Sequence, residues 1–257
     1  MLSQLVLLAQ LVSLAQLVLP VMTVAPKAAP ITDGKELVRA MHDRYAATWY
    51  RTLTFTQTTT HYDPDGTAHA ETWYEAIEVP GKLRIDFDPV AKGSGYQFVG
   101  DVLNVFEDGK LKSSNPFVHP LLLLGFDVYM LPPDESINKL TKLGYDLSVV
   151  REDTWQGRPV YVVGAKAGDM QSAQFWIDKK ELYFVRSIGP AGRDKTKTSE
   201  TQFNKYQKAG GGWVAAEVLF LVDGKRATLE EYYDIKANPK LDEKLFEKDH
   251  WTDVHLH

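Results

Sequence analysis

The segment at residues 117–133, FVHPLLLLGFDVYMLPP, constrains the fold more than any other part of this sequence. It is apolar almost throughout, yet Pro120, Gly125 and Pro132 break it well short of the ~20 continuous apolar residues that a membrane-spanning helix needs. It is also too apolar to be a solvated loop between strands. The segment is therefore predicted to be a helical lid or plug that lies over an apolar surface of the protein.

Most of the remaining sequence alternates polar and apolar residues with the period of two that is typical of β-strands. Turn signals separate the alternating stretches: residues 63–66 read DPDG, and residues 223–225 read DGK, which favours a tight hairpin. This pattern predicts about ten to twelve strands in an antiparallel meander. A meander of that length must curl, and its concave apolar face needs a cover.

Two helices are predicted besides the lid segment. Residues 34–49 are expected to form an amphipathic helix, because Asp33 can cap its first turn, Glu36 stands in the capping-box position and apolar residues recur at helical intervals. A shorter helix is expected at residues 137–143. The predicted fold class is mainly β (α+β): a strongly curled antiparallel sheet whose apolar face is covered by an N-terminal helix and a mid-chain helical lid.

The composition excludes several classes of function. The net charge is −5, the isoelectric point is near 5.8 and no basic stripe occurs, so no nucleic-acid partner is expected. The absence of cysteine excludes disulfides, cysteine-based metal sites, thiol catalysis and a lipidated N-terminal cysteine.

The N-terminus has the features of an export signal. An apolar run at residues 5–19 is followed by TVA at residues 23–25, and the first charged side chain is Lys27. The basic residues that normally begin such a signal are missing. We predict a signal peptide and linker at residues 1–29 and a single domain at residues 30–257. The alternative is an uncleaved membrane anchor at residues 2–25.

Several features stand in a distinctive order. The opening helix, the run of hairpins and the apolar insert are followed by an FWID strand at residues 175–178, GW at residues 212–213 and the DGK hairpin at residues 223–225. From about residue 33 to residue 251, this order resembles the periplasmic lipoprotein-carrier superfamily, the LolA/LolB-like proteins and their outer-membrane lipoprotein-sorting relatives.

This resemblance implies an unclosed half-barrel whose helical lid covers an apolar cavity that accepts acyl chains. It further implies a periplasmic, monomeric, non-enzymatic carrier or chaperone-type protein that binds acyl chains, lipids or lipoproteins in outer-membrane lipoprotein sorting, with no cofactor. The alternative is an envelope-stress sensor or protein–protein interaction module of the same fold, with a membrane-associated protein partner. Two features depart from the superfamily: the lid has no arginine, and without cysteine this chain cannot itself be a lipoprotein.

The resemblance also assigns ligand-binding residues to the lid and to inward strand positions. They are Phe117, Leu121, Leu122, Leu124, Phe126, Tyr129 and Met130 in the lid, and Leu83, Ile85, Phe87, Phe175, Ile177, Leu219 and Leu221 in the strands. The plainer interpretation is that the lid residues only fill the core, where each buried side chain contributes roughly 1.5–3 kcal/mol. The breaks at the prolines and the glycine favour a segment that can hinge.

Motifs for catalysis are absent from the sequence. It contains no Gly-x-Ser-x-Gly elbow, no phosphate-binding glycine-rich loop and no His-Glu-x-x-His motif. An enzyme acting on an apolar substrate would have to use His119 with Asp127 or Tyr129. The protein is therefore predicted not to be an enzyme.

Pairs of ionisable residues occur elsewhere, but none predicts a site. Two histidine pairs supply fewer than the three or four converging ligands that a metal needs, and two acid pairs are expected to be solvated surface charge. These pairs are His61/His69, His255/His257, Asp86/Asp88 and Glu230/Glu231.

Overall fold

The computed structural model describes residues 31–192 and 195–256. The predicted signal peptide at residues 1–29, and with it the alternative anchor at residues 2–25, lies outside the described residues. None of the described helices combines the length and the hydropathy needed to cross a bilayer.

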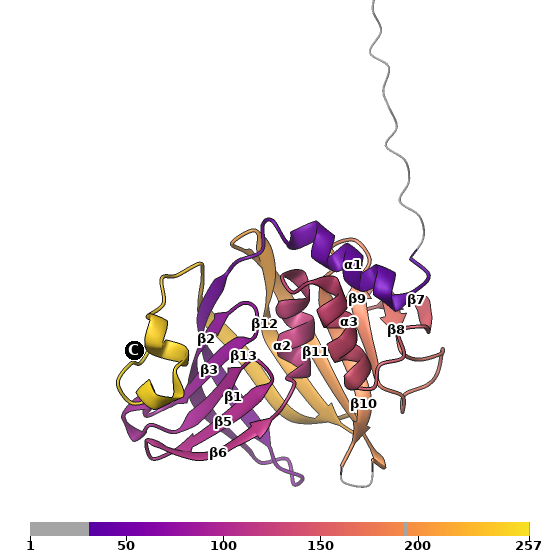
Figure 1. The fold of residues 1–257 in the computed structure, drawn as a ribbon. Helices are drawn as coiled ribbons and strands as arrows, with labels where there is room; N and C mark the ends of the chain where they lie inside the picture. Colours follow the sequence, from indigo (N-terminus) through magenta and orange to yellow (C-terminus); the bar gives the residue numbers. More distant parts are fainter. Residues whose placement is uncertain (1–30, 193–194, 257) are drawn as a thin grey trace, which may run out of the picture. The chain divides into compact units, whose positions relative to one another are not determined.

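One antiparallel sheet of 13 strands makes up most of the described fold (Figure 1). Its order is β6-β5-β4-β3-β2-β1-β13-β12-β11-β10-β9-β8-β7. The edge strands β6 and β7 do not pair with each other, so the sheet is not closed into a barrel, and the predicted fold class is confirmed. The strands are β1 (Thr52–Tyr62), β2 (Ala68–Glu78), β3 (Lys82–Phe87), β4 (Gly95–Val99), β5 (Val102–Glu107), β6 (Lys110–Pro116), β7 (Val150–Trp155), β8 (Arg158–Val163), β9 (Gln174–Asp178), β10 (Phe184–Ala191), β11 (Lys197–Ala209), β12 (Gly212–Val222) and β13 (Lys225–Ala237).

The sheet consists of two meanders joined by strands from opposite ends of the domain. Strands β1 to β6 each pair with the next along the chain, as do strands β7 to β13. The joint is the pairing of β1 with β13, where Leu53 stands opposite Ala237 and Gln57 opposite Tyr232. The edge strand β6, KLKSSNP, was missed from the sequence because it is polar and lacks clear alternation.

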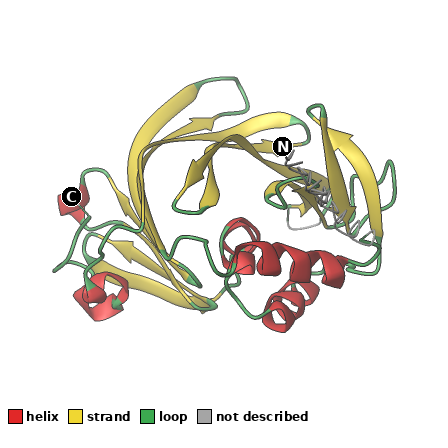
Figure 2. Ribbon diagram, turned by 90° about the horizontal axis from the view of Figure 1, so that it is seen from above, coloured by secondary structure: helices red, strands yellow, loops and turns green. Residues whose placement is uncertain are grey.

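The three α-helices of the described residues lie across the open side of the curved sheet (Figure 2). They are α1 (Gly34–Tyr45), α2 (Pro120–Gly125) and α3 (Pro133–Lys142), and the short 3₁₀ helices are η1 (Val90–Lys92), η2 (Asp127–Tyr129), η3 (Glu243–Phe246) and η4 (Lys248–His250). The helices α2, η2 and α3 belong to the connection that leads from β6, at one edge of the sheet, to β7, at the other. The predicted helical segment therefore spans the gap between the two edges.

Helix α1 begins as predicted but ends earlier. The side chain of Asp33 accepts a hydrogen bond from the backbone N–H of Lys35 at 2.6 Å, which caps the first turn. The helix ends at Tyr45 rather than at Trp49. The chain turns there, and the ring of Trp49 stacks on that of Tyr129 with the centroids 3.9 Å apart. Tertiary packing has thus shortened the helix that the sequence pattern favours.

The main core fills the space between the sheet and the helices. Tyr129 of η2 is fully buried in it, and its hydroxyl oxygen accepts a hydrogen bond from the backbone N–H of Phe184 at 3.1 Å. Gly212 allows the close approach of Trp49, because a Cβ atom at that position would lie 2.4 Å from the indole ring. These contacts fix η2 to the segment after α1 and to β10.

The C-terminal segment covers part of the opposite face of β3. Arg84 and Asp86 are buried there and form an ion pair at 2.9 Å, and the Arg84 guanidinium lies 4.0 Å from the centre of the Trp251 ring. Arg84 also donates hydrogen bonds to the backbone oxygens of Leu245 and Trp251. The prediction that Asp86 is a solvated surface charge is therefore wrong, whereas its neighbour Asp88 is exposed as predicted.

Candidate functional site

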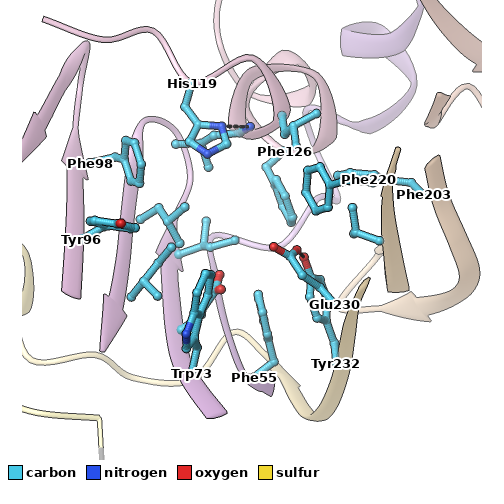
Figure 3. A pocket seen from close by; sticks show the side chains of 17 residues that line it. Phe55, Trp73, Tyr96, Phe98, His119, Phe126, Phe203, Phe220, Glu230 and Tyr232 are labelled. Atoms are coloured by element: carbon cyan, nitrogen blue, oxygen red, sulfur yellow. Dashed lines mark hydrogen bonds between the residues drawn. The ribbon is translucent and has the colours of Figure 1, made fainter. Parts of the chain in front are cut away.

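A cavity of about 260 Å³ lies between the sheet and α2 (Figure 3). Its wall is mostly aromatic and aliphatic, with three ionisable side chains, Glu75, Glu230 and His119, in addition to tyrosines. The lining residues are Phe55 of β1; Trp73, Glu75 and Ile77 of β2; Leu83 and Ile85 of β3; Tyr96 and Phe98 of β4; His119, Leu121, Leu122 and Phe126 of the lid; Phe203 of β11; Val218 and Phe220 of β12; and Glu230 and Tyr232 of β13.

His119 forms the N-terminal cap of α2. Its Nδ1 atom accepts a hydrogen bond from the backbone N–H of Leu122 at 3.1 Å, and Pro120 occupies the first helical turn (Figure 3). Since Nδ1 is an acceptor, the proton of the neutral ring is on Nε2. Burial lowers the pKa of His119 to about 4, so the imidazole is neutral at pH 7.

Apolar contacts hold α2 in place over the cavity. Leu122, Leu123 and Leu124 are all buried. At the end of the helix, Gly125 packs against Phe203, whose ring would lie 3.0 Å from a Cβ atom at that position. A larger residue at position 125 would push α2 away from the sheet.

The chain after α2 is held by polar contacts. The Oδ1 atom of Asp127 accepts a hydrogen bond from the backbone N–H of Gly81 at 2.9 Å. Burial raises the pKa of Asp127 to about 7. Lys139 of α3 forms an ion pair with Asp101 in the turn between β4 and β5. The second half of the lid is therefore anchored to the sheet, whereas α2 is anchored by side-chain packing.

Two carboxyl groups lie opposite the lid, at the sheet side of the cavity. The Oε2 atom of Glu230 accepts a hydrogen bond from the hydroxyl of Tyr232 at 2.9 Å (Figure 3). Burial raises the pKa of Glu230 to about 7, against the opposing effect of hydrogen bonds from Tyr232 and Gln57. Glu75 is only 6% exposed, and burial raises its pKa well above the usual range, with a further contribution from the charge of Glu230.

These carboxyl groups correct an expectation from the sequence. Glu230 was predicted to be a solvated surface charge together with Glu231, but it lines the cavity. Glu231 is exposed, as predicted, and lies 3.7 Å from Lys205 on the other face of the sheet. Glu75 was missed, although the period of two that places Trp73 and Ile77 inward also places Glu75 inward.

The predicted ligand-binding residues fall into different parts of the structure. Leu83, Ile85, Leu121, Leu122 and Phe126 line the cavity. Phe87 lies just behind the wall, where its ring contacts those of Trp73 and Tyr96 at centroid distances of 4.9 and 5.0 Å. The residues buried in the core away from the cavity lining are Leu124, Tyr129, Phe175 and Ile177. Ligand binding by these residues stays a prediction.

The remaining predicted residues lie elsewhere. Phe117 is exposed and lines a second hollow beside the lid, and Met130 is half-buried against the core. Leu219 and Leu221 are absent from the cavity wall, which takes Val218 and Phe220 from the same strand instead. Because side chains alternate along a strand, the prediction for β12 was out of phase by one residue.

Of the two histidine pairs, His61/His69 lies within the described residues, whereas His257 of the second pair lies outside them. His61 Nε2 lies 3.0 Å from a carboxylate oxygen of Glu71, and its ring centroid is 5.1 Å from that of His69. Within the described residues, no group of three or more such side chains converges as a metal would require. The candidate catalytic residues Asp127 and Tyr129 hydrogen-bond backbone atoms of Gly81 and Phe184, respectively, rather than His119.

Solved structures with the same architecture identify the fold. A putative outer membrane lipoprotein-sorting protein domain from Vibrio parahaemolyticus has a TM-score of 0.62 at 14% identity, with 85% of this chain and 98% of that chain covered. A DUF1329 family protein from Desulfovibrio piger has a TM-score of 0.58 at 14% identity, with coverages of 85% and 97%. A LolA superfamily protein from Nitrosomonas europaea has a TM-score of 0.54 at 12% identity, with coverages of 83% and 98%.

The chain therefore has the fold of the LolA superfamily, which confirms the resemblance inferred from the order of its sequence features. In addition, a family model described as "Uncharacterized protein" matches residues 135–252. No curated protein matches the sequence significantly.

Proposed function

We propose that this protein is a non-enzymatic periplasmic carrier that holds a lipid or the acyl chain of a lipoprotein in the cavity beneath α2. The observation that carries the proposal is an apolar cavity enclosed between an unclosed sheet and a short lid. The fold that the chain shares with a lipoprotein-sorting domain supports this function and a location in the cell envelope. The predicted export signal at residues 1–29 supports the same location.

The size of the cavity suits a single slender chain. Its volume of about 260 Å³ is slightly below the roughly 300–1,000 Å³ that is usual for pockets holding drug-sized ligands. Each methylene transferred from water into the cavity stabilises the complex by ~0.8 kcal/mol before the costs of ordering are subtracted. An acyl chain of ordinary length would thus bind stably, yet remain exchangeable.

The anchoring of the lid indicates which part moves. Asp127 and Tyr129 fix the chain after α2 to the sheet through hydrogen bonds. In contrast, Leu122, Leu123 and Leu124 hold α2 through apolar contacts that an incoming chain could replace. We therefore assign the gate to α2 (Pro120–Gly125), together with its cap His119.

Native mass spectrometry combined with organic extraction tests this function on protein purified without detergent. The expected result is a co-purifying lipid or acylated species, or uptake of added fatty acid or phospholipid by the empty protein. A protein that is empty and refuses every added lipid would contradict the proposal. In that case the lid residues only fill the core, and a protein partner becomes the better candidate ligand.

A further inference from the structure

The cavity contains two carboxyl groups that the binding of an acyl chain does not explain. Glu75 comes from β2 and Glu230 from β13, and β1 lies between these strands in the sheet. In the register of the sheet, Glu75 stands opposite Phe55 of β1, and Glu230 opposite Thr59. The two groups are near enough for the charge of Glu230 to raise the pKa of Glu75.

No cation compensates these acids. The wall of the cavity contains no lysine or arginine, and none of the ion pairs within the described residues includes Glu75 or Glu230. Glu230 accepts a hydrogen bond from Tyr232, but Glu75, which is 94% buried, has no hydrogen-bond partner among the described residues. A carboxyl group that faces a cavity without a protein partner favours a ligand group that would satisfy it.

The surrounding rings favour a positive ligand group. The cavity has eight aromatic side chains in its wall, among them Phe55 and Tyr232, whose rings stack with centroids 4.3 Å apart. Aromatic faces attract ammonium groups, and this attraction strengthens when water is excluded. An anionic head group, in contrast, would meet two acids and no basic side chain in this cavity.

We infer that the cavity selects amphiphiles with a cationic amine head, an inference that rests on the carrier function proposed above. The ammonium group lies between Glu75 and Glu230 and against the neighbouring aromatic rings. The alkyl chain extends towards the lid, where it contacts Leu121, Leu122 and Phe126. This inference names the chemical class of the ligand, which the fold by itself leaves open.

The ionisable groups around the site make binding depend on pH. An ammonium head favours the ionised form of Glu230, so binding releases the proton of that carboxyl group to solvent. The other ionisable groups facing the cavity are Glu75, His119 and the phenols of Tyr96 and Tyr232. His119 is neutral above pH 6, because its pKa is about 4. We therefore expect the affinity for the amine to rise between pH 6 and pH 8, as Glu230 with its pKa of about 7 ionises.

Isothermal titration calorimetry with three matched ligands tests the inference on the full-length protein. The ligands are decyltrimethylammonium, decanol and decanoate, each below its aggregation concentration. At pH 7.5 we expect the Kd of the ammonium ligand to be lower than that of decanol by about tenfold or more, with decanoate the weakest. Equal affinities, or tightest binding of decanoate, would overturn the inference while leaving the carrier function intact. Binding of none of the three would count against the carrier function itself.

Substitutions test whether the two carboxyl groups cause the preference for the ammonium ligand. The double variant Glu75→Gln, Glu230→Gln should reduce the preference for ammonium over decanol to within about twofold. The matched control is Glu231→Gln, which removes the adjacent carboxylate on the exposed face of β13 and should keep the preference. A double variant that keeps the full preference would overturn the assignment. If the double variant does not fold, Glu230→Gln by itself should abolish the rise in affinity between pH 6 and pH 8.

Discussion

Asp127, the first residue of η2, accepts a hydrogen bond through Oδ1 from the backbone N–H of Gly81 at 2.9 Å. This bond joins the lid to the turn between β2 and β3. Tyr129 joins the same part of the lid to β10 through Phe184. The chain before α2 is fixed as well, because the backbone N–H of Phe117 donates a hydrogen bond to the backbone oxygen of Asp101 at 2.8 Å. Between these fixed points α2 is held by side-chain packing, so α2 is the part of the lid that can open.

Asp127→Ala should loosen the lid. It leaves the Gly81 N–H without its partner, which we expect to lower the free energy of unfolding by about 1–2 kcal/mol. Amide hydrogen exchange across α2 should become faster. Asp127→Asn keeps an acceptor oxygen and should behave almost as the wild type. The control Asp134→Ala removes an exposed partner of Arg39 and should change little. Unaltered exchange of α2 in the alanine variant would show that this bond does not hold the lid.

Leu122→Arg should abolish ligand retention. Leu122 is 4% exposed and lines the cavity, so an arginine there either occupies the apolar space or forces α2 outward. The bound lipid, measured by extraction and mass spectrometry, should disappear while the β-type circular dichroism stays. The matched control is Leu111→Arg on the edge strand β6, where the leucine is 45% exposed. An unchanged ligand load in the Leu122 variant would refute the role of α2 as gate.

Because of Glu230, the free energy of unfolding of the protein should decrease as the pH rises. Its pKa of about 7 in the folded protein lies above the 4.5 of the free side chain. The folded protein therefore binds more protons than the unfolded chain between these values, and the free energy of unfolding decreases as the pH rises through this range. The loss amounts to at most roughly 3 kcal/mol for this group. Urea unfolding at pH 5 and pH 8 should show a smaller decrease for Glu230→Gln than for the wild type. An identical decrease in both proteins would contradict the burial of this carboxyl group.

His119→Ala should destabilise α2 through the loss of its cap. The backbone N–H of Leu122 would lose its acceptor, at a cost of about 0.5–2 kcal/mol in the free energy of unfolding. Asparagine is a good capping residue, so His119→Asn should recover most of this loss. Thermal unfolding of the two variants beside the wild type measures the difference. If alanine and asparagine are equally destabilising, the role of His119 is not that of a cap.

The fold was predicted correctly from the sequence where a pattern of polar and apolar residues has only one structural interpretation. The alternation on either side of the DPDG turn and the apolar segment at residues 117–133 each have one interpretation, and the structure confirms strands and a helical insert there. Strand β12 is different, because Val218, Leu219, Phe220 and Leu221 are all apolar. Alternation cannot then say which residues face the cavity, and pairing with β11 and β13 decides it.

The charged residues of the interior were harder to predict for a physical reason. Acidic residues usually lie on the surface, but this rule fails where a segment distant in sequence packs over the acidic side chain. Asp86 is buried beside Arg84, whose guanidinium packs on Trp251 of the C-terminal segment. Glu75 is buried and Glu230 half-buried in the cavity, which the lid covers on the open side of the sheet. Local sequence contains no information about such covers.

The pairing of β1 with β13 has a consequence for the order in which the molecule is made. The first and last strands of the sheet are neighbours at its centre, whereas the middle of the chain supplies both outer edges. During synthesis, β1 lacks its second partner until residues 225–237 have left the ribosome. The two halves of the sheet can therefore unite only when the domain is nearly complete, and contacts of such long range form slowly. The centre of the sheet is thus the last part of the fold to be assembled, after both of its edges have been synthesised.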